Sequence, residues 1–228
     1  MSRTSTVAER RAEIIAAAIR VLSRDGLFET TTRKIAAEAN VNQATLRYYF
    51  GSKDDLLFAV LQDMMRRTGE IVRAGLSADR GFHEAIAESM NAFWAHFEAT
   101  PELEVMQYEL TLYAIRHPDS AWLAKQQYDG YSALIEALLQ ETFKAAGQTC
   151  AVPYSNLARF IISGVDGLML QFISDRDTNR ARRDLDHLIT AVITLSGVTF
   201  SHREATHNEN ELFEPSTLMS PGSTRDTE

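Results

Sequence analysis

The sequence predicts an all-α fold of about nine helices, in which an N-terminal three-helix bundle precedes a larger C-terminal helical domain. Three observations lead to this prediction. Apolar residues recur at spacings of three and four residues in almost every segment. No segment alternates apolar and polar residues as a half-exposed strand would, and only five prolines interrupt the 228 residues. Hydrophobic residues make up 45% of the chain, which is enough to bury a substantial core.

The first helix is expected from about residue 7 to residue 24, because apolar side chains share one face and arginines lie on the others. Gly26 supplies the stop at its C-terminal end. Leu27 and Phe28 are then expected to pack back against this helix.

Two short helices are expected next, over residues 32–39 and 43–50, with an interval so short that a tight turn must join them. Such a helix-turn-helix unit needs a small residue where the helices cross, a turn residue that tolerates left-handed backbone, and aliphatic packing on the second helix. Ala36, Asn40 and Leu46 stand at those places. Asparagine is a permitted turn residue because it reaches positive φ at low cost.

The remainder of the chain also has helical periodicity. Ser52 can cap a long helix that continues to about residue 74, with two acidic residues in its first turn. Further helices are expected over about 82–99, 101–116, 119–146, 153–174 and 180–201. Residues 202–228 are polar, lose the apolar period and contain prolines, so a flexible tail is expected there.

Net charge alone argues against a polyanionic partner, because the chain carries a formal charge of -8. The distribution of charge changes this reading. Residues 1–67 contain 11 Lys and Arg against 8 Asp and Glu, whereas residues 68–228 contain 12 against 23. A small basic unit on a larger acidic remainder could contact phosphate through the basic unit alone.

Several function classes find no support in the sequence. Cys150 is the only cysteine, which excludes an intrachain disulfide and a cysteine-cluster zinc site. No glycine-rich phosphate loop or nucleophile elbow is present, and His83 with Glu84 lacks the second histidine of a metal motif. We therefore expect no enzyme activity, cofactor or metal. No apolar run reaches the roughly 20 residues of a membrane span, and no signal peptide is evident, so a cytoplasmic protein without membrane contact is expected.

The stretch TTTRKIAAEANVNQATLRYYFGSKDDLL, residues 30–57, resembles the DNA-binding region of the TetR family of bacterial transcriptional regulators. The family pattern runs T-x-x-x-I-A-x-x-x-G-V-S-x-x-x-L-Y-x-Y/H-F-x-x-K-x-x-L. The resemblance implies a ligand-responsive regulator, most often a repressor, that binds palindromic double-stranded operator DNA as a homodimer on the nucleoid and is released by a small-molecule effector. It also implies a DNA-binding domain over residues 1–52 and a ligand-binding and dimerisation domain over residues 53–201.

By this resemblance, the first turn of the second short helix reads DNA bases. Gln43, Ala44 and Thr45 would face base edges, because glutamine pairs with adenine while alanine and threonine touch a thymine methyl group. Asn42 would cap this helix, and Arg33 would reach a base or a phosphate from the preceding one.

The resemblance assigns Tyr48, Tyr49 and Lys53 to the DNA backbone. The alternative that the tyrosines are simply core aromatics of a small helical domain stays open. Arg47 departs from the family pattern, which usually has tyrosine there. A longer cation at this position could alter phosphate anchoring or reach a guanine.

The resemblance further implies an effector pocket in the C-terminal helices, and aromatic and methionine side chains would suit an apolar or aromatic effector. Plain core packing is the alternative for any one of them. Glu109 lies in an otherwise apolar helix, where a carboxylate needs a partner or a water-filled cavity, and it could orient the effector. The candidate pocket residues are Met90, Phe93, Trp94, Phe97, Met106, Glu109, Tyr113, Tyr128 and Tyr131, with Gln107 and His96 as weaker candidates.

The last two helices would form a four-helix dimer interface by the same resemblance, since small residues allow close helix approach and apolar residues line the final helix. The candidate interface residues are Gly164, Gly167, Leu188, Val192 and Leu195. Burial of these faces within one chain is the alternative. Two other functions also remain open: a helical small-molecule-binding or interaction protein without DNA binding, and a transcriptional activator.

Overall fold

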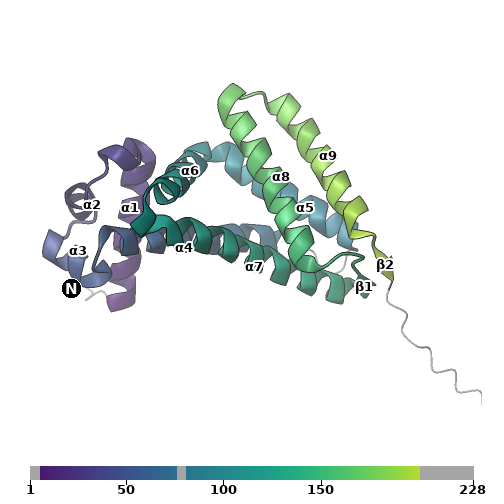
Figure 1. The fold of residues 1–228 in the computed structure, drawn as a ribbon, viewed down its shortest axis with the longest axis horizontal. Helices are drawn as coiled ribbons and strands as arrows, with labels where there is room; N and C mark the ends of the chain where they lie inside the picture. Colours follow the sequence, from purple (N-terminus) through teal and green to yellow (C-terminus); the bar gives the residue numbers. More distant parts are fainter. Residues whose placement is uncertain (1–5, 76–80, 201–228) are drawn as a thin grey trace, which may run out of the picture.

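The computed structural model describes residues 6–75 and 81–200. Within those ranges the chain forms nine α-helices, one short 3₁₀ helix and two strands of two residues each, which confirms the all-α prediction. Figure 1 shows the first three helices gathered at one end of the elongated molecule and the last two helices toward the other. The predicted tail, residues 202–228, lies outside the described residues.

The N-terminal end is built from α1 (Val7–Glu29), α2 (Thr32–Glu38) and α3 (Gln43–Phe50). We call these helices, together with the first half of α4, the head. Gly26 has φ 75° and ψ 167°, so the helical path breaks there within α1. Leu27 turns inward and is 3% exposed, but Phe28 is 90% exposed. The expectation that Phe28 packs against the first helix is therefore wrong, because adjacent side chains beyond the break point in opposite directions.

Helix α4 (Lys53–Ala74) joins the head to the rest of the chain. It begins with a capping box, in which Ser52 accepts a hydrogen bond from the backbone N–H of Asp55 and the carboxylate of Asp55 accepts one from the backbone N–H of Ser52. Its first turns pack in the head core, whereas Gly69, farther along, lies against Leu134. One helix thus belongs to both ends of the molecule.

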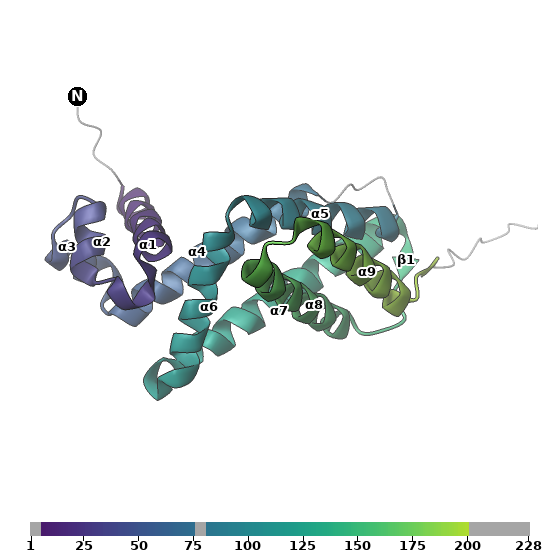
Figure 2. The same cartoon turned by 90° about the horizontal axis from the view of Figure 1, so that it is seen from above.

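The remaining helices form what we call the body. They are α5 (Phe82–Ala99), α6 (Pro101–Arg116), the 3₁₀ turn Pro118–Ser120, α7 (Ala121–Ala146), α8 (Tyr154–Asp175) and α9 (Thr178–Ser196). Helices α8 and α9 run side by side, and α6 lies between the head and the rest of the body (Figures 1 and 2).

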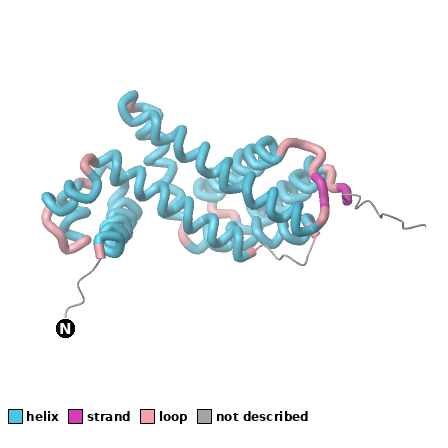
Figure 3. Tube along the Cα trace, turned by 90° about the horizontal axis from the view of Figure 1, so that it is seen from below, coloured by secondary structure: helices cyan, strands magenta, loops and turns pink. Residues whose placement is uncertain are grey.

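Two short strands close the far end of the body. Strand β1 (Gln148–Thr149) pairs antiparallel with β2 (Thr199–Phe200), as Figure 3 shows in magenta. The last helix therefore ends at Ser196 rather than near Ser201, because Gly197 takes a left-handed conformation with φ 51°. Strands of two residues are too short to show any alternation in sequence, so nothing predicted them.

Two hydrophobic cores lie along the chain. The first joins α1, α2, α3 and the start of α4 to Met106, Leu110 and Ala114 of α6. The second joins α5, α7, α8 and α9, with Trp94 and Phe143 fully buried in it. The first core therefore extends from the head into the body through one face of α6.

Candidate functional site

The turn between α2 and α3 has the geometry that a helix-turn-helix unit needs. Asn40 has φ 52°, and the backbone N–H of Val41 donates to the carbonyl of Ala36 over 2.9 Å. Ala36 and Leu46 are 2% and 3% exposed, so the small residue and the packing leucine both lie in the crossing. The left-handed turn residue therefore directs α3 outward from a fixed base.

The N-terminus of α3 is exposed and rigidly capped. The side-chain Oδ1 of Asn42 accepts a hydrogen bond from the backbone N–H of Thr45 over 2.7 Å. Gln43 and Ala44 are exposed, and Thr45 is half-buried. The three residues expected to read bases thus stand together on the first turn of α3.

Carboxylates neutralise several cations of the head. Arg20 and Arg24 both bind Glu38, over 2.8 and 3.4 Å, and these arginines hold the pKa of that carboxyl below its usual range. Arg33 and Arg47 differ, because they are exposed and have no ion pair within residues 6–75 and 81–200. Arg33 on α2 and Arg47 on α3 therefore place unpaired positive charge beside the exposed first turn.

The aromatic residues at the end of α3 divide between core and surface. Phe50 is 5% exposed, with the guanidinium of Arg11 5.1 Å from its ring centre. Tyr48 is 80% exposed and meets the half-buried Tyr49 edge to face at 5.4 Å. Lys53 Nζ donates to the carbonyl of Thr30 over 3.3 Å, which ties the start of α4 to the start of the helix-turn-helix unit.

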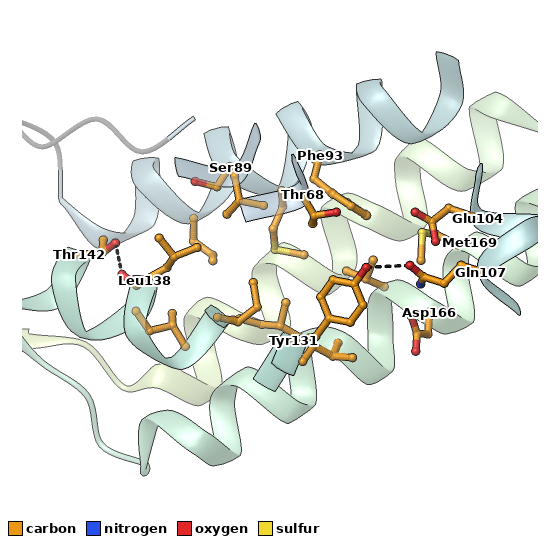
Figure 4. A pocket seen from close by; sticks show the side chains of 18 of the residues that line it. Thr68, Ser89, Phe93, Glu104, Gln107, Tyr131, Leu138, Thr142, Asp166 and Met169 are labelled. Atoms are coloured by element: carbon orange, nitrogen blue, oxygen red, sulfur yellow. Dashed lines mark hydrogen bonds between the residues drawn. The ribbon is translucent and has the colours of Figure 1, made fainter. Parts of the chain in front are cut away.

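The body holds a cavity of about 100 Å³. A single water needs roughly a tenth of that space, so the cavity can admit a small organic molecule. Aliphatic and aromatic side chains from α4, α5, α7 and α8 form most of its wall (Figure 4). The lining residues are Thr68, Val72, Phe82, Ile86, Ser89, Met90, Phe93, Glu104, Gln107, Tyr131, Ile135, Leu138, Leu139, Thr142, Ile161, Ile162, Val165, Asp166 and Met169.

Polar groups gather at one end of this cavity. Figure 4 shows Glu104, Gln107 and Asp166 together there, with the hydroxyl of Tyr131 donating to Gln107 Oε1 over 2.7 Å. Burial raises the pKa of Glu104 to about 7, and the nearby Asp166 carboxylate adds to the effect. Burial also raises the pKa of Asp166, although the hydroxyl of Tyr128 donates to its Oδ2 over 3.1 Å. Both carboxyls therefore hold their protons more tightly than exposed ones.

The structure brings only part of the predicted pocket set to the cavity. Met90, Phe93 and Tyr131 line it. Trp94, Phe97 and Met106 instead lie in the packed cores, where each is 1% exposed or less. Their helical spacing made them good cavity candidates. Spacing shows which side chains share one face of a helix, but it does not show whether that face is packed or borders a cavity.

Three further candidates have other neighbours. Tyr113 stacks on His117 with ring centres 4.2 Å apart, on the head side of α6. Tyr128 is 37% exposed and reaches the cavity only through its hydrogen bond to Asp166. Glu109 does not face the cavity: its Oε2 accepts a hydrogen bond from the backbone N–H of Leu27 over 2.8 Å. The partner that a carboxylate in this apolar helix required is therefore the backbone of the head.

Sequence reasoning missed the two carboxyls of the cavity. Glu104 stands in the first turn of α6, where an acidic residue is expected simply to complement the helix dipole. Asp166 lies in α8 between Val165 and Gly167. Its position within an apolar helix is the same signal that singled out Glu109, so this residue could have been found.

The predicted dimer residues on α8 and α9 also separate into two groups. A Cβ added to Gly164 would overlap the side chain of Leu188 of the same chain, and Val192 is fully buried. Gly164, Leu188 and Val192 therefore take part in α8–α9 packing within one chain. Gly164 and Leu188 are only half-buried, so their place in a dimer interface stays a prediction. Gly167 has no atom within 4 Å of its Cβ position, and Leu195 is 38% exposed.

The outer face of α8 is apolar and open. Phe160 is 39% exposed and Leu170 is 52% exposed. Within the part of the chain that the structure describes, α8 is the one helix long and apolar enough to cross a membrane, by length and composition only. Only 28% of the most apolar 18-residue stretch of α8 is buried within the chain.

Comparisons with known proteins found matches to both the head and the body. Residues 14–60 match the family of bacterial regulatory proteins described as the tetR family, and residues 82–195 match the tetracyclin repressor-like C-terminal domain. The HTH-type nicotine-responsive transcriptional repressor HdnoR of Paenarthrobacter nicotinovorans is 31% identical over 197 residues, which cover 86% of this chain and 100% of that protein. The HTH-type transcriptional regulator BetI of Brucella suis is 38% identical over 78 residues, covering 34% of this chain and 39% of BetI.

Solved structures share the fold at lower sequence identity. A TetR-family regulator structure from Mesorhizobium loti has a TM-score of 0.67 at 17% identity, covering 85% of this chain and 98% of that one. Another from a Rhodococcus species has a TM-score of 0.68 at 17% identity, covering 83% and 100%. At this identity the likeness establishes the arrangement of helices.

Proposed function

Because this chain belongs to the TetR family of bacterial transcriptional regulators, we propose that it is a repressor that binds palindromic operator DNA as a homodimer and is released by a small-molecule effector. The observation that carries the proposal is the exposed first turn of α3 beside cations that no carboxylate neutralises. That is the surface a major groove requires, since bases are read by polar side chains while phosphates attract free positive charge.

In this proposal α3 enters the major groove with its N-terminal turn foremost. Gln43, Ala44 and Thr45 read base edges, and Arg33 reaches a base or a phosphate from α2. The exposed Tyr48, the half-buried Tyr49 and Lys53 hold the DNA backbone. Arg47 adds a phosphate or guanine contact, because its guanidinium is exposed and has no competing carboxylate in the described chain.

The open face of α8 is the proposed dimer interface. It combines Phe160, Leu170 and the bare backbone of Gly167, and Leu195 of α9 continues it. A second copy of the chain covers this face in a two-fold arrangement, which also presents two heads to two half-sites. The apolar length of α8 then reflects burial between subunits rather than within a membrane, in keeping with a cytoplasmic regulator.

Helix α6 connects the cavity to the head. Gln107 lines the cavity, while its neighbour Met106 lies in the head core and accepts a hydrogen bond from Ser23 on Sδ at 3.6 Å. Two residues later, Glu109 holds the backbone N–H of Leu27. An effector that shifts α6 therefore also moves α1, and the distance between the two heads then no longer fits the operator. This requires that the effector binds the shifted state more tightly than the DNA-bound one.

The relative HdnoR supports repression and a small organic effector. HdnoR is described as a nicotine-responsive repressor, and it matches this chain through the ligand-binding half as well as the head. We therefore assign repression as the mode of action. An effector with an apolar or aromatic part fits the cavity wall.

The test is fluorescence anisotropy of the full chain with DNA fragments from the region upstream of its own gene and of the adjacent genes. We expect one fragment to bind in the nanomolar range, as specific sites do, and binding to weaken steeply with salt. A reporter fused to that fragment should fall when the protein is expressed. Absence of a shift with every fragment at moderate salt would sink the DNA-binding proposal, and a rise of the reporter would replace repression by activation.

A further inference from the structure

The polar end of the cavity is acidic and lacks a cation. Glu104 comes from α6 and Asp166 from α8, and Figure 4 shows both carboxyls at the same end of an otherwise apolar space. Neither carboxyl forms an ion pair within residues 6–75 and 81–200. Two carboxyls have thus been placed at one end of the cavity, and no cation of the described chain is paired with either.

One oxygen of this pair is left without any partner. Glu104 Oε2 is buried and accepts no hydrogen bond in the described chain. A buried acceptor without a partner costs free energy, and a buried carboxylate without a counter-charge costs more. Asp166 is better satisfied, because Tyr128 donates to its Oδ2 over 3.1 Å. The unpartnered Oε2 therefore marks the point where a missing donor belongs.

We infer that the effector of the proposed repressor is a hydrophobic organic cation, an amine protonated at neutral pH, whose ammonium group lies between Glu104 and Asp166 and whose apolar part fills the rest of the cavity. This inference rests on the proposed function and names the class of molecule that the cavity takes. The ammonium donates to Glu104 Oε2 and balances both carboxyls at once.

The surroundings favour a cation over the other classes of ligand. Burial and the neighbouring carboxyl raise the pKa of Glu104 because both disfavour its charged form. A bound ammonium favours the charged form, because it supplies the opposite charge. An anionic ligand would meet two acidic groups and gain nothing from them. Tyr131 directs its hydroxyl toward this end and holds Gln107 Oε1 over 2.7 Å, so neither residue supplies a positive charge there.

The cavity also limits the size and shape of the amine. Its space of about 100 Å³ fits a small molecule rather than a polymer or a lipid. Away from Glu104 and Asp166 the wall is built from side chains such as Ile86, Leu139 and Val165. The cation therefore belongs at one end of the effector, with an aromatic or aliphatic group at the other.

Three probes on one skeleton test the charge requirement: 4-phenylbutylamine, 4-phenylbutan-1-ol and 4-phenylbutyrate. Binding to the full-length dimer is measured by isothermal titration calorimetry and by the shift in Tm at pH 7.5. We expect the amine to bind at least about tenfold more tightly than the alcohol, since a buried charge pair is worth more than a neutral hydrogen bond. Equal binding of all three probes, preference for the carboxylate, or no binding of the amine would overturn the inference.

Variants locate the cation. Glu104→Gln keeps the shape and removes the charge, and it should weaken the amine about tenfold while leaving the alcohol within about threefold. Asp166→Asn should act in the same direction. Glu102→Gln is the matched control, because Glu102 lies in the same first turn of α6 but is exposed. If Glu102→Gln and Glu104→Gln weaken the amine equally, the ammonium does not lie at Glu104 and the inference fails.

Operator release separates this inference from the function on which it rests. If the amine binds through Glu104 but leaves the operator complex intact, the cation site stands and effector release fails. If the carboxylate or the alcohol releases the operator more strongly than the amine, effector release stands and the cation inference fails.

Discussion

The carboxylate of Glu109 on α6 accepts a hydrogen bond from the backbone N–H of Leu27 at the end of α1, with 2.8 Å between Oε2 and N. The same carboxylate lies against Gly26, where a Cβ would meet its oxygens at 3.5 Å. A side chain of the body thus holds the residues at which the first helix of the head breaks.

Glu109→Ala should loosen this joint. It leaves the Leu27 N–H without its acceptor, so the free energy of unfolding should fall by about 1–2 kcal/mol. Effector binding to the cavity should persist while its effect on operator affinity shrinks. Urea denaturation and operator titrations with and without effector measure both. Glu109→Gln retains an acceptor oxygen and serves as the control; a normal effector response in Glu109→Ala would contradict the coupling role.

Gln43 and Lys53 should affect DNA binding in different ways. Gln43→Ala should relax preference at one base position at a cost of about 1–3 kcal/mol, because its side chain pairs with one base. Lys53→Ala should weaken all sequences alike and reduce the slope of log affinity against log salt by about one. Binding to a set of single-base operator variants at several salt concentrations measures this. Equal loss on every variant for Gln43→Ala would refute its reading role.

Arg47 should matter more than a cation already held by a carboxylate. Arg47→Ala should weaken operator binding several-fold, because an unpaired guanidinium loses no ion pair when it binds phosphate. Arg20→Ala is the matched control, since Arg20 is occupied by Glu38 over 2.8 Å. Anisotropy titrations compare the two variants. Similar losses for both would show that general head charge, rather than the position of Arg47, sets the affinity.

Leu170→Asp should dissociate the proposed dimer. Leu170 is 52% exposed on the open face of α8, and a second chain covering it would have to bury the new carboxylate without a partner. Analytical ultracentrifugation should show a shift from dimer to monomer, with the helical circular dichroism retained. Leu112→Asp on α6 is the control, because Leu112 is similarly exposed at 54% but lies elsewhere. A dimeric Leu170→Asp protein would place the interface on another face.

Glu104 should make the unliganded protein less stable as pH rises. Burial raises its folded-state pKa from 4.5 to about 7, so between those values the folded state keeps a proton that the unfolded state has lost. The contribution of Glu104 to the free energy of unfolding is therefore constant below about pH 4.5, falls as the pH rises from 4.5 to about 7, and levels off above that. The groups around it are Asp166, Tyr108, Tyr128 and Tyr131, none of which supplies a positive charge.

Urea denaturation of the wild type and of Glu104→Gln between pH 5 and pH 8 measures this effect. Relative to the variant, the wild type should lose about 2 kcal/mol over the range, because the glutamine cannot ionise. Parallel curves for the two proteins would show that the carboxyl ionises as freely in the folded chain as in the unfolded one.

The sequence predicted the helices and the helix-turn-helix unit well because those features depend on local chemistry. Asn42 caps α3 and Asn40 turns the backbone for reasons contained within a few residues. The cavity depends on which apolar stripes meet and which leave space, and no single helix records that. Trp94 was therefore expected at the cavity and lies in the core, whereas Glu104, which resembles an ordinary first-turn acid, lies at the cavity.

The same limit explains the dimer residues. Small residues on α8 predicted a close helix approach, and the approach exists, but Gly164 makes it with Leu188 of its own chain. Sequence alone does not say which partner a small residue receives. The exposed Leu170 on the open face became visible only once α8 was placed against α9.

Helix α6 gives one face to the head core and the other to the cavity, and this double use limits how the protein can acquire a new inducer. A substitution on α6 that reshapes the cavity also disturbs the surface that packs in the head core and binds the backbone of Leu27. It therefore alters effector recognition and the effector response together. Helices α5 and α8 place no residue in the head core within the described chain, so substitutions there carry no such linkage. Directed evolution of a biosensor from this chain should therefore draw its working variants from those two walls and leave α6 intact.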